Sequence, residues 1–395
     1  MVVSAPHRHV VISALGMAQI FAWGTSFYFP AVFAGPIVRE TAWPLEWVVG
    51  GTSLGLLVAG LISPKVGAVV DVHGGRPVLL TSSLCYAAGL STIGLAPSLA
   101  IYFAGWLLIG LGMGTGLYDA VFAALGRMYG AEARGQIATL TLFGGFASTV
   151  CWPLSAFMID HIGWRAACFA YATVHLLLLL PLQMFATRGG KPMPHAAAAT
   201  QNASEPSRIA NEWAVVLLLA TVLSLAAGIG SIIVVHLLIF LQARGLDMTS
   251  AVALGTLFGP AQVAARVIEK IFGSRYHPFW TMLAACGLMA IGMLLFVFEV
   301  PLLALAILLY GGGYGVSWIG RGTLPLALFG PARFPRLMGR LAFPSLIVQA
   351  LAPSAGAVLI DRAGTEHTLA VLCTVACLNV LLIAALWQAS RASHS

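Results

Sequence analysis

Residues 67–76 read GAVVDVHGGR and form the most informative stretch of the chain. The stretch joins two apolar segments, and it contains one carboxylate, Asp71, and one guanidinium, Arg76. Gly67 would let two helices approach closely, and Gly74 would allow a tight turn between the two segments. The Asp71 carboxylate can lie against a helix N-terminus or a basic side chain. The stretch therefore indicates a packed loop between two consecutive helices.

The composition of the chain shows which solvent surrounds it. Of the 395 residues, 59% are hydrophobic and only 8% are charged, whereas soluble proteins carry about 25% charged residues. The polar surface that water requires is missing, so we expect lipid to cover most of the chain. This excludes a soluble enzyme, a secreted disulfide scaffold and a nucleic-acid-binding module, although the net charge of +7 alone would suit a nucleic acid.

Apolar segments long enough to cross a bilayer recur along the chain, since one spanning helix needs about 20 such residues. We predict twelve spans, at residues 10–36, 47–70, 77–97, 99–126, 136–159, 165–187, 213–240, 248–271, 278–298, 301–328, 337–360 and 368–390. The segments are continuous, whereas those of a membrane β-barrel are short and alternating. The expected fold class is therefore an all-α membrane protein.

The distribution of basic residues predicts the orientation. With a cytoplasmic N-terminus, fourteen of the 20 Lys and Arg lie on the cytoplasmic side, two lie within spans, and only four lie outside, namely Arg39, Arg165, Arg244 and Arg362. The positive-inside rule then predicts that both termini are cytoplasmic. An excess of Arg over Lys (17 to 3) and abundant Ala and Gly favour a bacterial cytoplasmic (inner) membrane. The first apolar segment is long and shows no cleavage site for a signal peptide.

The spacing G-x-x-x-D-x-x-G-x-R of residues 67–76 resembles the signature loop of the major facilitator superfamily. The twelve spans agree with this resemblance, as does an internal repeat in which the first half matches the second at offsets of 205 and 201 residues. The resemblance implies two pseudo-symmetric six-helix bundles, residues 1–187 and 213–395. The polar segment 188–212 would be the cytoplasmic linker between them.

The resemblance also implies a mechanism. Transporters of this class hold their site between the two halves near the middle of the membrane, and rocking of the halves gives alternating access. We therefore expect a secondary active transporter that works as a monomer. The sequence has no Walker motif, metal-ligand cluster or nucleophile–base constellation, so we expect no ATP, no metal, no cofactor and no enzymatic activity. All six cysteines lie in predicted spans, so no disulfide framework is expected.

Three strongly charged residues, Asp119, Arg266 and Arg321, lie well inside predicted spans. Each costs about 2.5–3.5 kcal/mol near the bilayer centre, so such residues are functional candidates. Asp119 and Arg321 take nearly equivalent places in spans 4 and 10, which face each other across the cavity in the facilitator fold. We expect Asp119 to couple protons or to act as a gate, paired with Arg321 or Arg266, and Arg321 to bind an anion or close the gate. A permanent ion pair that only holds the bundle is the alternative.

Arg266 resembles the arginine in span 8 of monocarboxylate transporters and oxalate/formate exchangers, which binds the substrate carboxylate. A guanidinium can pair with a carboxylate through two parallel hydrogen bonds, so the chemistry fits. As an alternative, Arg266 could extend its head group to the cytoplasmic face, because it precedes Lys270 by only four residues. The exchanger's lysine in span 11 is replaced here by Gln349, so oxalate itself is not expected.

Weaker candidates for substrate binding lie on spans 1, 7 and 10, which line the cavity in this fold. They are Gln19, Trp23 and Ser26 on span 1, His236 on span 7, and Tyr314 and Ser317 on span 10. A lone membrane histidine such as His236 more often makes an interhelical hydrogen bond than it binds a ligand. His175 lies on span 6, an outer helix by analogy with the fold, and is not a candidate.

The sequence therefore predicts a transporter that moves a small organic anion, with a monocarboxylate as the first choice and protons as the candidate coupling ions. The alternative is a drug or cation exporter (a proton antiporter) of the same superfamily, in which Asp119 would bind the cation. A remote alternative is a membrane sensor that binds a ligand without moving it.

Overall fold

The computed structural model describes residues 7–188, 212–297 and 302–391, which form helices joined by turns. The chain falls into two compact units: unit 1 comprises residues 1–199 and 331–343, and unit 2 comprises residues 200–330 and 344–395. The all-α fold class is confirmed. The predicted linker, 188–212, lies outside the described residues except for its first and last positions. The predicted division into residues 1–187 and 213–395 stays a prediction.

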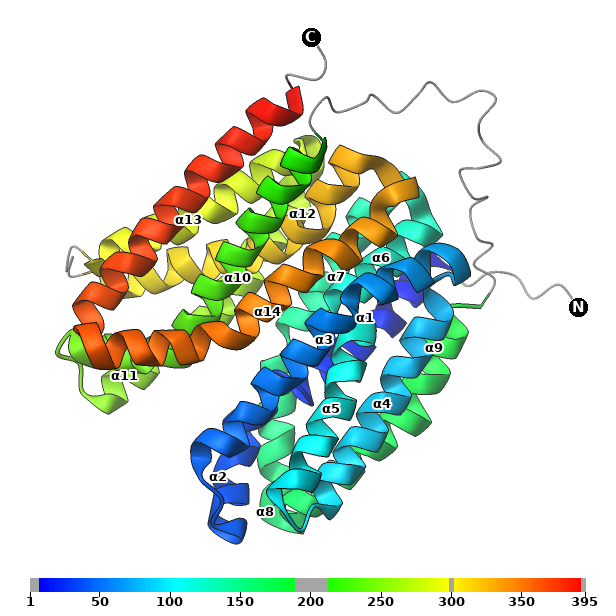
Figure 1. The fold of residues 1–395 in the computed structure, drawn as a ribbon, viewed down its shortest axis with the longest axis vertical. Coiled ribbons are helices and arrows are strands. Elements are labelled where there is room, and N and C mark those ends of the chain that lie inside the picture. Colours follow the sequence, from blue (N-terminus) through cyan, green and yellow to red (C-terminus); the bar gives the residue numbers. More distant parts are fainter. Residues whose placement is uncertain (1–6, 189–211, 298–301, 392–395) are drawn as a thin grey trace, which may run out of the picture. The chain divides into compact units, whose positions relative to one another are not determined.

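Unit 1 is formed mainly by the helices of the first half of the chain. In chain order these are α1 (Arg8–Gly24), α2 (Phe29–Thr41), α3 (Leu45–His73), α4 (Gly75–Leu95), α5 (Leu99–Gly116), α6 (Tyr118–Tyr129), the 3-10 turn η1 (Gly130–Glu132), α7 (Ala133–Gly145), α8 (Ala147–Val174), the π-helical turn η2 (His175–Leu179) and α9 (Leu180–Ala186). Helix α5 packs against α3 and α4, and α1 packs against α7, α8 and α9 (Figure 1).

Unit 2 is formed by the helices of the second half. These are α10 (Glu212–Ala243), α11 (Met248–Gly255), α12 (Phe258–Phe272), the 3-10 turn η4 (Gly273–Arg275), α13 (Pro278–Val297) and α14 (Leu303–Arg391), of which residues 331–343 belong to unit 1.

Eight helical stretches among the described residues are long and apolar enough to cross a bilayer. The two longest, Leu99–Ala186 and Leu303–Arg391, each contain two glycines with positive φ. These are Gly130 (60°), Gly163 (76°), Gly330 (71°) and Gly364 (82°). Because glycine adopts this left-handed conformation at no steric cost, it can interrupt a helix sharply. Each long stretch thus divides into three segments, which with the other six stretches match the twelve predicted spans.

Three spans of unit 1 are also interrupted internally, one of them span 5, at Phe146 between α7 and α8. Span 1 breaks at the turn 25–28 between α1 and α2, and span 4 breaks at Leu117, which is extended (φ −77°, ψ −178°) between α5 and α6. At such a break, the last carbonyl groups of one half-helix and the first N–H groups of the next lack helical partners. Discontinuous membrane helices form substrate and ion sites in other transporters for this reason. The breaks in spans 1 and 4 direct attention to the candidate residues around them.

The signature loop lies where α3 meets the segment 331–343. A Cβ atom on Gly67 would lie 2.6 Å from the carbonyl oxygen of Pro335, so only glycine fits this close approach. Asp71 forms an ion pair with Arg336, with 2.6 Å between Oδ2 and Nε. The spacing of a glycine four residues before the carboxylate therefore places both on the helix face that packs against this segment.

The rest of the loop makes the turn from α3 to α4. Gly74 has a positive φ of 77°, as the tight turn requires. The carbonyl oxygen of Asp71 accepts a hydrogen bond from Arg127 Nε (3.2 Å), and Arg76 Nη1 reaches the carbonyl oxygen of Met184 at 3.5 Å. The loop thus ties four helices of unit 1 together at one end, namely α3, α4, α6 and α9.

Candidate functional site

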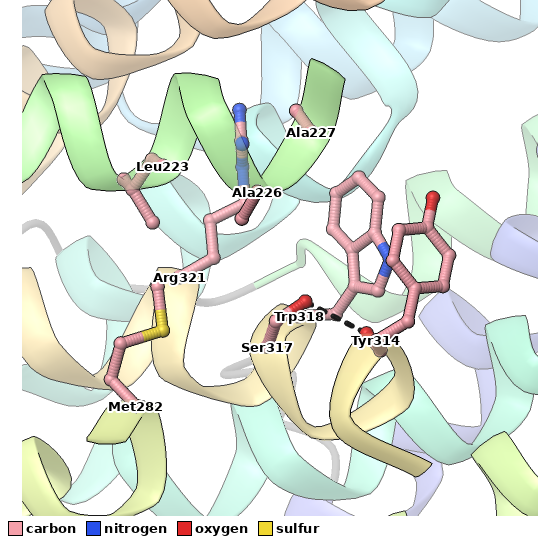
Figure 2. Close-up of a pocket in the computed structure, with 8 residues that line it drawn as sticks. All are labelled: Leu223, Ala226, Ala227, Met282, Tyr314, Ser317, Trp318 and Arg321. Atoms are coloured by element: carbon pink, nitrogen blue, oxygen red, sulfur yellow. Dashed lines mark hydrogen bonds between the residues drawn. The ribbon is translucent and has the colours of Figure 1, made fainter. Parts of the chain in front are cut away.

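A pocket in unit 2 lies between α10, α13 and the first part of α14. Its walls are mostly apolar or aromatic, with one guanidinium. The lining residues are Leu223, Ala226 and Ala227 of α10, Met282 of α13, and Tyr314, Ser317, Trp318 and Arg321 of α14. Figure 2 shows Arg321 extending from α14 towards α10, with the rings of Tyr314 and Trp318 beside each other. The cavity itself measures about 10 Å³, room for about one water molecule, so a larger ligand requires its walls to move apart.

The α14 residues reach this pocket together because they share one helix face. Positions 314, 317, 318 and 321 follow the spacing i, i+3, i+4 and i+7. Arg321 is only 4% exposed, and its Nη1 donates a hydrogen bond to Ser345 Oγ (2.6 Å). Its guanidinium carbon also lies 5.4 Å from the centre of the Trp318 ring, a distance at which the ring face attracts a cation. The structure therefore keeps a positive charge in the wall of an apolar pocket.

Two further polar groups of the pocket are oriented by local contacts. Ser317 Oγ donates to the carbonyl oxygen of Tyr314 (2.7 Å), the dashed line in Figure 2, so its lone pairs remain as acceptors. The Tyr314 ring packs against Gly230 of α10, where a Cβ atom would overlap it. The ring of Phe258 stacks on Tyr314 with 5.8 Å between centroids. Tyr314 is thus held between two helices.

Arg266 is buried, with 3% of its surface exposed. Its Nε donates to the carbonyl oxygen of Gly315 (2.9 Å), and its Nη2 donates to Gln262 Oε1 (3.3 Å). A Cβ atom on Gly315 would lie 2.7 Å from the Cα atom of Gln262, so α12 and α14 are in close contact here. The alternative of a head group extended to the membrane surface is wrong, because this contact brings acceptors within reach inside unit 2. Arg266 is not among the lining residues of the described pocket.

In unit 1, Gln19 points at the break in span 4. It is 1% exposed, and its Nε2 donates to the carbonyl oxygen of Gly116 at 2.6 Å. Because a carbonyl oxygen can only accept, the amide nitrogen must face Gly116. The other amide atom, Oε1, is buried and has no hydrogen-bond partner among the described residues. Gln19 thus stabilises the end of α5 and offers one unused acceptor at the break.

Trp23 and Asp119 lie at the same break. The Trp23 ring packs against Tyr118 (5.1 Å between centroids) and Phe27 (5.6 Å). Asp119 follows Tyr118 in the first turn of α6 and is half-buried, and the N-terminal end of a helix favours a carboxylate. The predicted pairing of Asp119 with Arg321 or Arg266 stays a prediction.

Two other candidates make local or interhelical bonds. Ser26 Oγ donates to the carbonyl oxygen of Ala22 at 2.5 Å, one turn earlier in the chain. His236 Nε2 donates to the carbonyl oxygen of Pro353 (3.0 Å), as expected of a lone membrane histidine. These bonds give both side chains a structural role, and their predicted contact with substrate stays a prediction.

A buried histidine, His175, lies beside the break in span 1. It is fully buried in the π-helical turn η2, close before Pro181, and its ring stacks on Tyr86 (4.8 Å between centroids). Its Nε2 lies 3.0 Å from Thr25 Oγ1, which already donates its own proton to Phe21. Nε2 must therefore carry the proton. His175 therefore helps to hold the break in span 1 and packs against span 3. Its exclusion as a substrate-binding candidate stays a prediction. A proline shortly after a histidine in an apolar run is the signal that could have revealed it, because proline disturbs the preceding helical turn.

A family model described as Major Facilitator Superfamily matches residues 12–298, and the chain belongs to this superfamily. The chain is similar to the niacin transporter NiaP of Acinetobacter baylyi, with 30% identity over 122 residues, which are 31% of this chain and 27% of that one. It is also similar to monocarboxylate transporter 13 of Rattus norvegicus, with 29% identity over 172 residues, which are 42% and 37% of the two chains. The matched stretches thus span about a third of the length of these curated relatives.

Among solved structures, the crystal structure of the human organic anion transporter MFSD10 (TETRAN) has the same fold. It superposes with a TM-score of 0.74 over 96% of this chain and 100% of that one, at 16% sequence identity. The protein is therefore a multi-pass membrane protein of the major facilitator superfamily, as the signature loop predicted.

Proposed function

We propose that the protein transports a small organic anion, with a monocarboxylate as the first choice, and that Arg321 binds its carboxylate. One observation carries the proposal: Arg321 is the one charged residue among the eight that line the pocket of unit 2. A mostly apolar pocket with few polar groups is typical of small-molecule sites, where the polar groups fix orientation. A guanidinium in such a place favours an anionic ligand.

The chemistry of the pocket limits the ligand further. The planar guanidinium offers two parallel N–H groups to the two oxygens of a carboxylate. The apolar side chains of Leu223 and Met282 and the ring of Trp318 suit a short hydrocarbon body, and Ser317 adds an acceptor. These groups favour a small carboxylate over a large or strongly hydrated solute. The names of two relatives, a monocarboxylate transporter and a niacin transporter, support this choice.

The other predicted residues take supporting roles in the proposal. Arg266 sets the contact between α12 and α14 and thereby the orientation of the pocket-lining face of α14. Gln19 and Trp23 stand at the break in span 4, where a change of conformation during alternating access costs the fewest helical hydrogen bonds. Asp119, beside this break, is the proposed carboxylate for proton coupling or gating. The proposed setting is a bacterial inner membrane with both termini in the cytoplasm, and the proposed working form is a monomer.

A thermal-shift panel tests the proposal. The purified protein is heated with a series of small monocarboxylates, and a bound ligand raises the melting temperature. We expect acids to stabilise the wild type and Arg321→Gln to abolish the effect. Arg362→Gln, which removes an exposed arginine of unit 2, serves as the matched control and should respond like the wild type.

Lipophilic cations form the second arm of the panel. Stabilisation by cations but not by acids would contradict the anion proposal and favour the exporter alternative. Equal stabilisation by acids in wild type and Arg321→Gln would reject the role of Arg321. Arg266→Gln, run in parallel, separates a direct role of Arg266 from a supporting one. If Arg266 supports the structure, its replacement lowers the melting temperature of the protein without ligand.

A further inference from the structure

One end of unit 2 carries a cluster of basic and aromatic side chains, which we call the basic–aromatic end. It lies where α12 stops and α13 begins, joined by η4, and where α14 finishes (Figure 1). Its principal members are Lys270, Arg275, Tyr276, Trp280, Trp387 and Arg391. None of these residues takes part in the pocket or in the signature loop.

The exposed face of α12 shows at which level of the membrane this end lies. Ile268 and Ile271 are 59% and 58% exposed, so this face must be covered by lipid chains. One turn further on, the exposed side chains change to Arg275 and Tyr276, and Trp280 follows at the start of α13. A change from aliphatic to aromatic and basic side chains marks the boundary between hydrocarbon and headgroups. The basic–aromatic end is therefore at headgroup level.

Ring contacts bring the end of α14 to the same place. The ring of Trp387 stacks on Phe279 (4.4 Å between centroids) and lies 5.1 Å from the ring of His277. The guanidinium carbon of Arg391 lies 5.5 Å from the centre of the Trp387 ring. Because Phe279 lies in the first turn of α13, only four residues after Arg275, these contacts hold Arg391 at the same end of unit 2 as Arg275.

Among the residues that the structure describes, the exposed charges at this end are all basic, and Glu212 at the start of α10 is half-buried. Lys270, Arg275 and Arg391 are exposed, whereas Glu269 is half-buried and accepts a hydrogen bond from Thr281 Oγ1 (2.6 Å). The opposite end of unit 2 differs. There the exposed charged residues among those described are Asp247, Asp361, Arg362 and Glu366. The positive charge is therefore concentrated at one headgroup level.

We infer that the basic–aromatic end binds the headgroup of an anionic phospholipid. Its basic side chains would meet the phosphate, and the exposed rings of Tyr276 and Trp280 would lie among the glycerol and upper acyl groups, where aromatic side chains are favoured. One basic side chain near an anionic lipid surface strengthens binding about fivefold. Loss of three should therefore weaken the preference for anionic over zwitterionic lipid by about 100-fold. This inference does not depend on the transported substrate.

The test compares lipids of equal chain length on the full chain. The protein in mild detergent is titrated with phosphatidylglycerol or phosphatidylcholine, and bound lipid is counted by native mass spectrometry. The variants are Arg275→Gln and the triple change Lys270→Gln, Arg275→Gln, Arg391→Gln, and the control is Arg362→Gln at the opposite end. Soluble glycerol phosphate, added in a third arm, shows whether the phosphate alone is enough.

We expect the wild type and Arg362→Gln to prefer phosphatidylglycerol, Arg275→Gln to lose about fivefold and the triple variant to show almost no preference. Glycerol phosphate should not compete, because it lacks the acyl chains. An unchanged preference in the triple variant, or an equal loss in Arg362→Gln, would overturn the inference, as would full competition by glycerol phosphate. Should the triple variant fail to fold, Arg275→Gln alone decides, since an exposed Arg to Gln change perturbs stability little.

Discussion

Replacing Arg321 by lysine separates the charge of this residue from its geometry. In the wild type, Arg321 Nη1 lies 2.6 Å from Ser345 Oγ. The lysine variant keeps a positive group near this hydroxyl, so the packing of α14 should survive. A lysine ammonium cannot form the two parallel hydrogen bonds that a guanidinium makes with a carboxylate, and its contact with the Trp318 ring changes. A hydrogen bond to a charged group contributes about 1.5–3 kcal/mol. We therefore expect the dissociation constant for a monocarboxylate to rise about 10- to 100-fold.

Isothermal titration of the purified protein with the best acid of the panel measures this change. Arg362→Lys is the matched control, because it makes the same exchange at an exposed position of unit 2. The melting temperature without ligand must stay near that of the wild type, which shows that the pocket is intact. An Arg321→Lys variant that binds the acid as tightly as wild type would refute the reasoning, because charge alone would then suffice.

Three further predictions concern other contacts. Arg266→Gln removes the donor to the carbonyl oxygen of Gly315. The variant should lose about 1–3 kcal/mol of folding stability, measured as a lower melting temperature. An unchanged melting temperature would show that the bond is not needed. Asp71→Asn and Arg336→Gln break the same ion pair, so each should speed hydrogen exchange in residues 331–343. The double variant should exchange no faster than either single variant. Additive effects in the double variant would contradict this. Hydrogen bonds from Ser250 and Thr249 lower the pKa of Asp247, the N-cap of α11, below its ordinary 3.8. The ionised Asp247 carboxylate stabilises the fold above pH 3.8, and this stabilisation disappears as the pH falls through the lowered pKa. The melting temperature of the wild type should therefore fall in this acidic range relative to that of Asp247→Asn. Parallel melting temperatures across the range would exclude this cap.

The positions of the spans follow from the sequence because lipid imposes one simple requirement. Each span needs an unbroken apolar run, and the ends of such runs are visible in the composition. The turns at Gly163 and Gly364 lie between predicted spans for the same reason. The breaks within spans were not predicted: the turn 25–28 and Leu117 are flanked by apolar residues on both sides, and hydropathy cannot distinguish a helical from an extended apolar residue.

The candidate site was predictable in part. Arg321, Tyr314 and Ser317 were selected by helical spacing, and they do share a pocket, because a helix face is a local property of the sequence. Met282 and Leu223 were not selected, since apolar residues in a membrane protein carry no signal of their own. For Arg266, the sequence left a buried and a surface position open. The choice between them depends on which acceptors a neighbouring helix offers, here Gly315, and a single span does not contain that information.

Uptake by the reconstituted protein tests the proposed function most directly. Proteoliposomes that contain wild type or Arg321→Gln are given a radiolabelled monocarboxylate, with and without an inward proton gradient, and empty liposomes give the background. We predict saturable uptake by wild type that unlabelled acids inhibit and lipophilic cations do not, and uptake at background level in Arg321→Gln. Equal uptake of the acid by both proteins, or transport of cations in place of acids, would contradict the proposal.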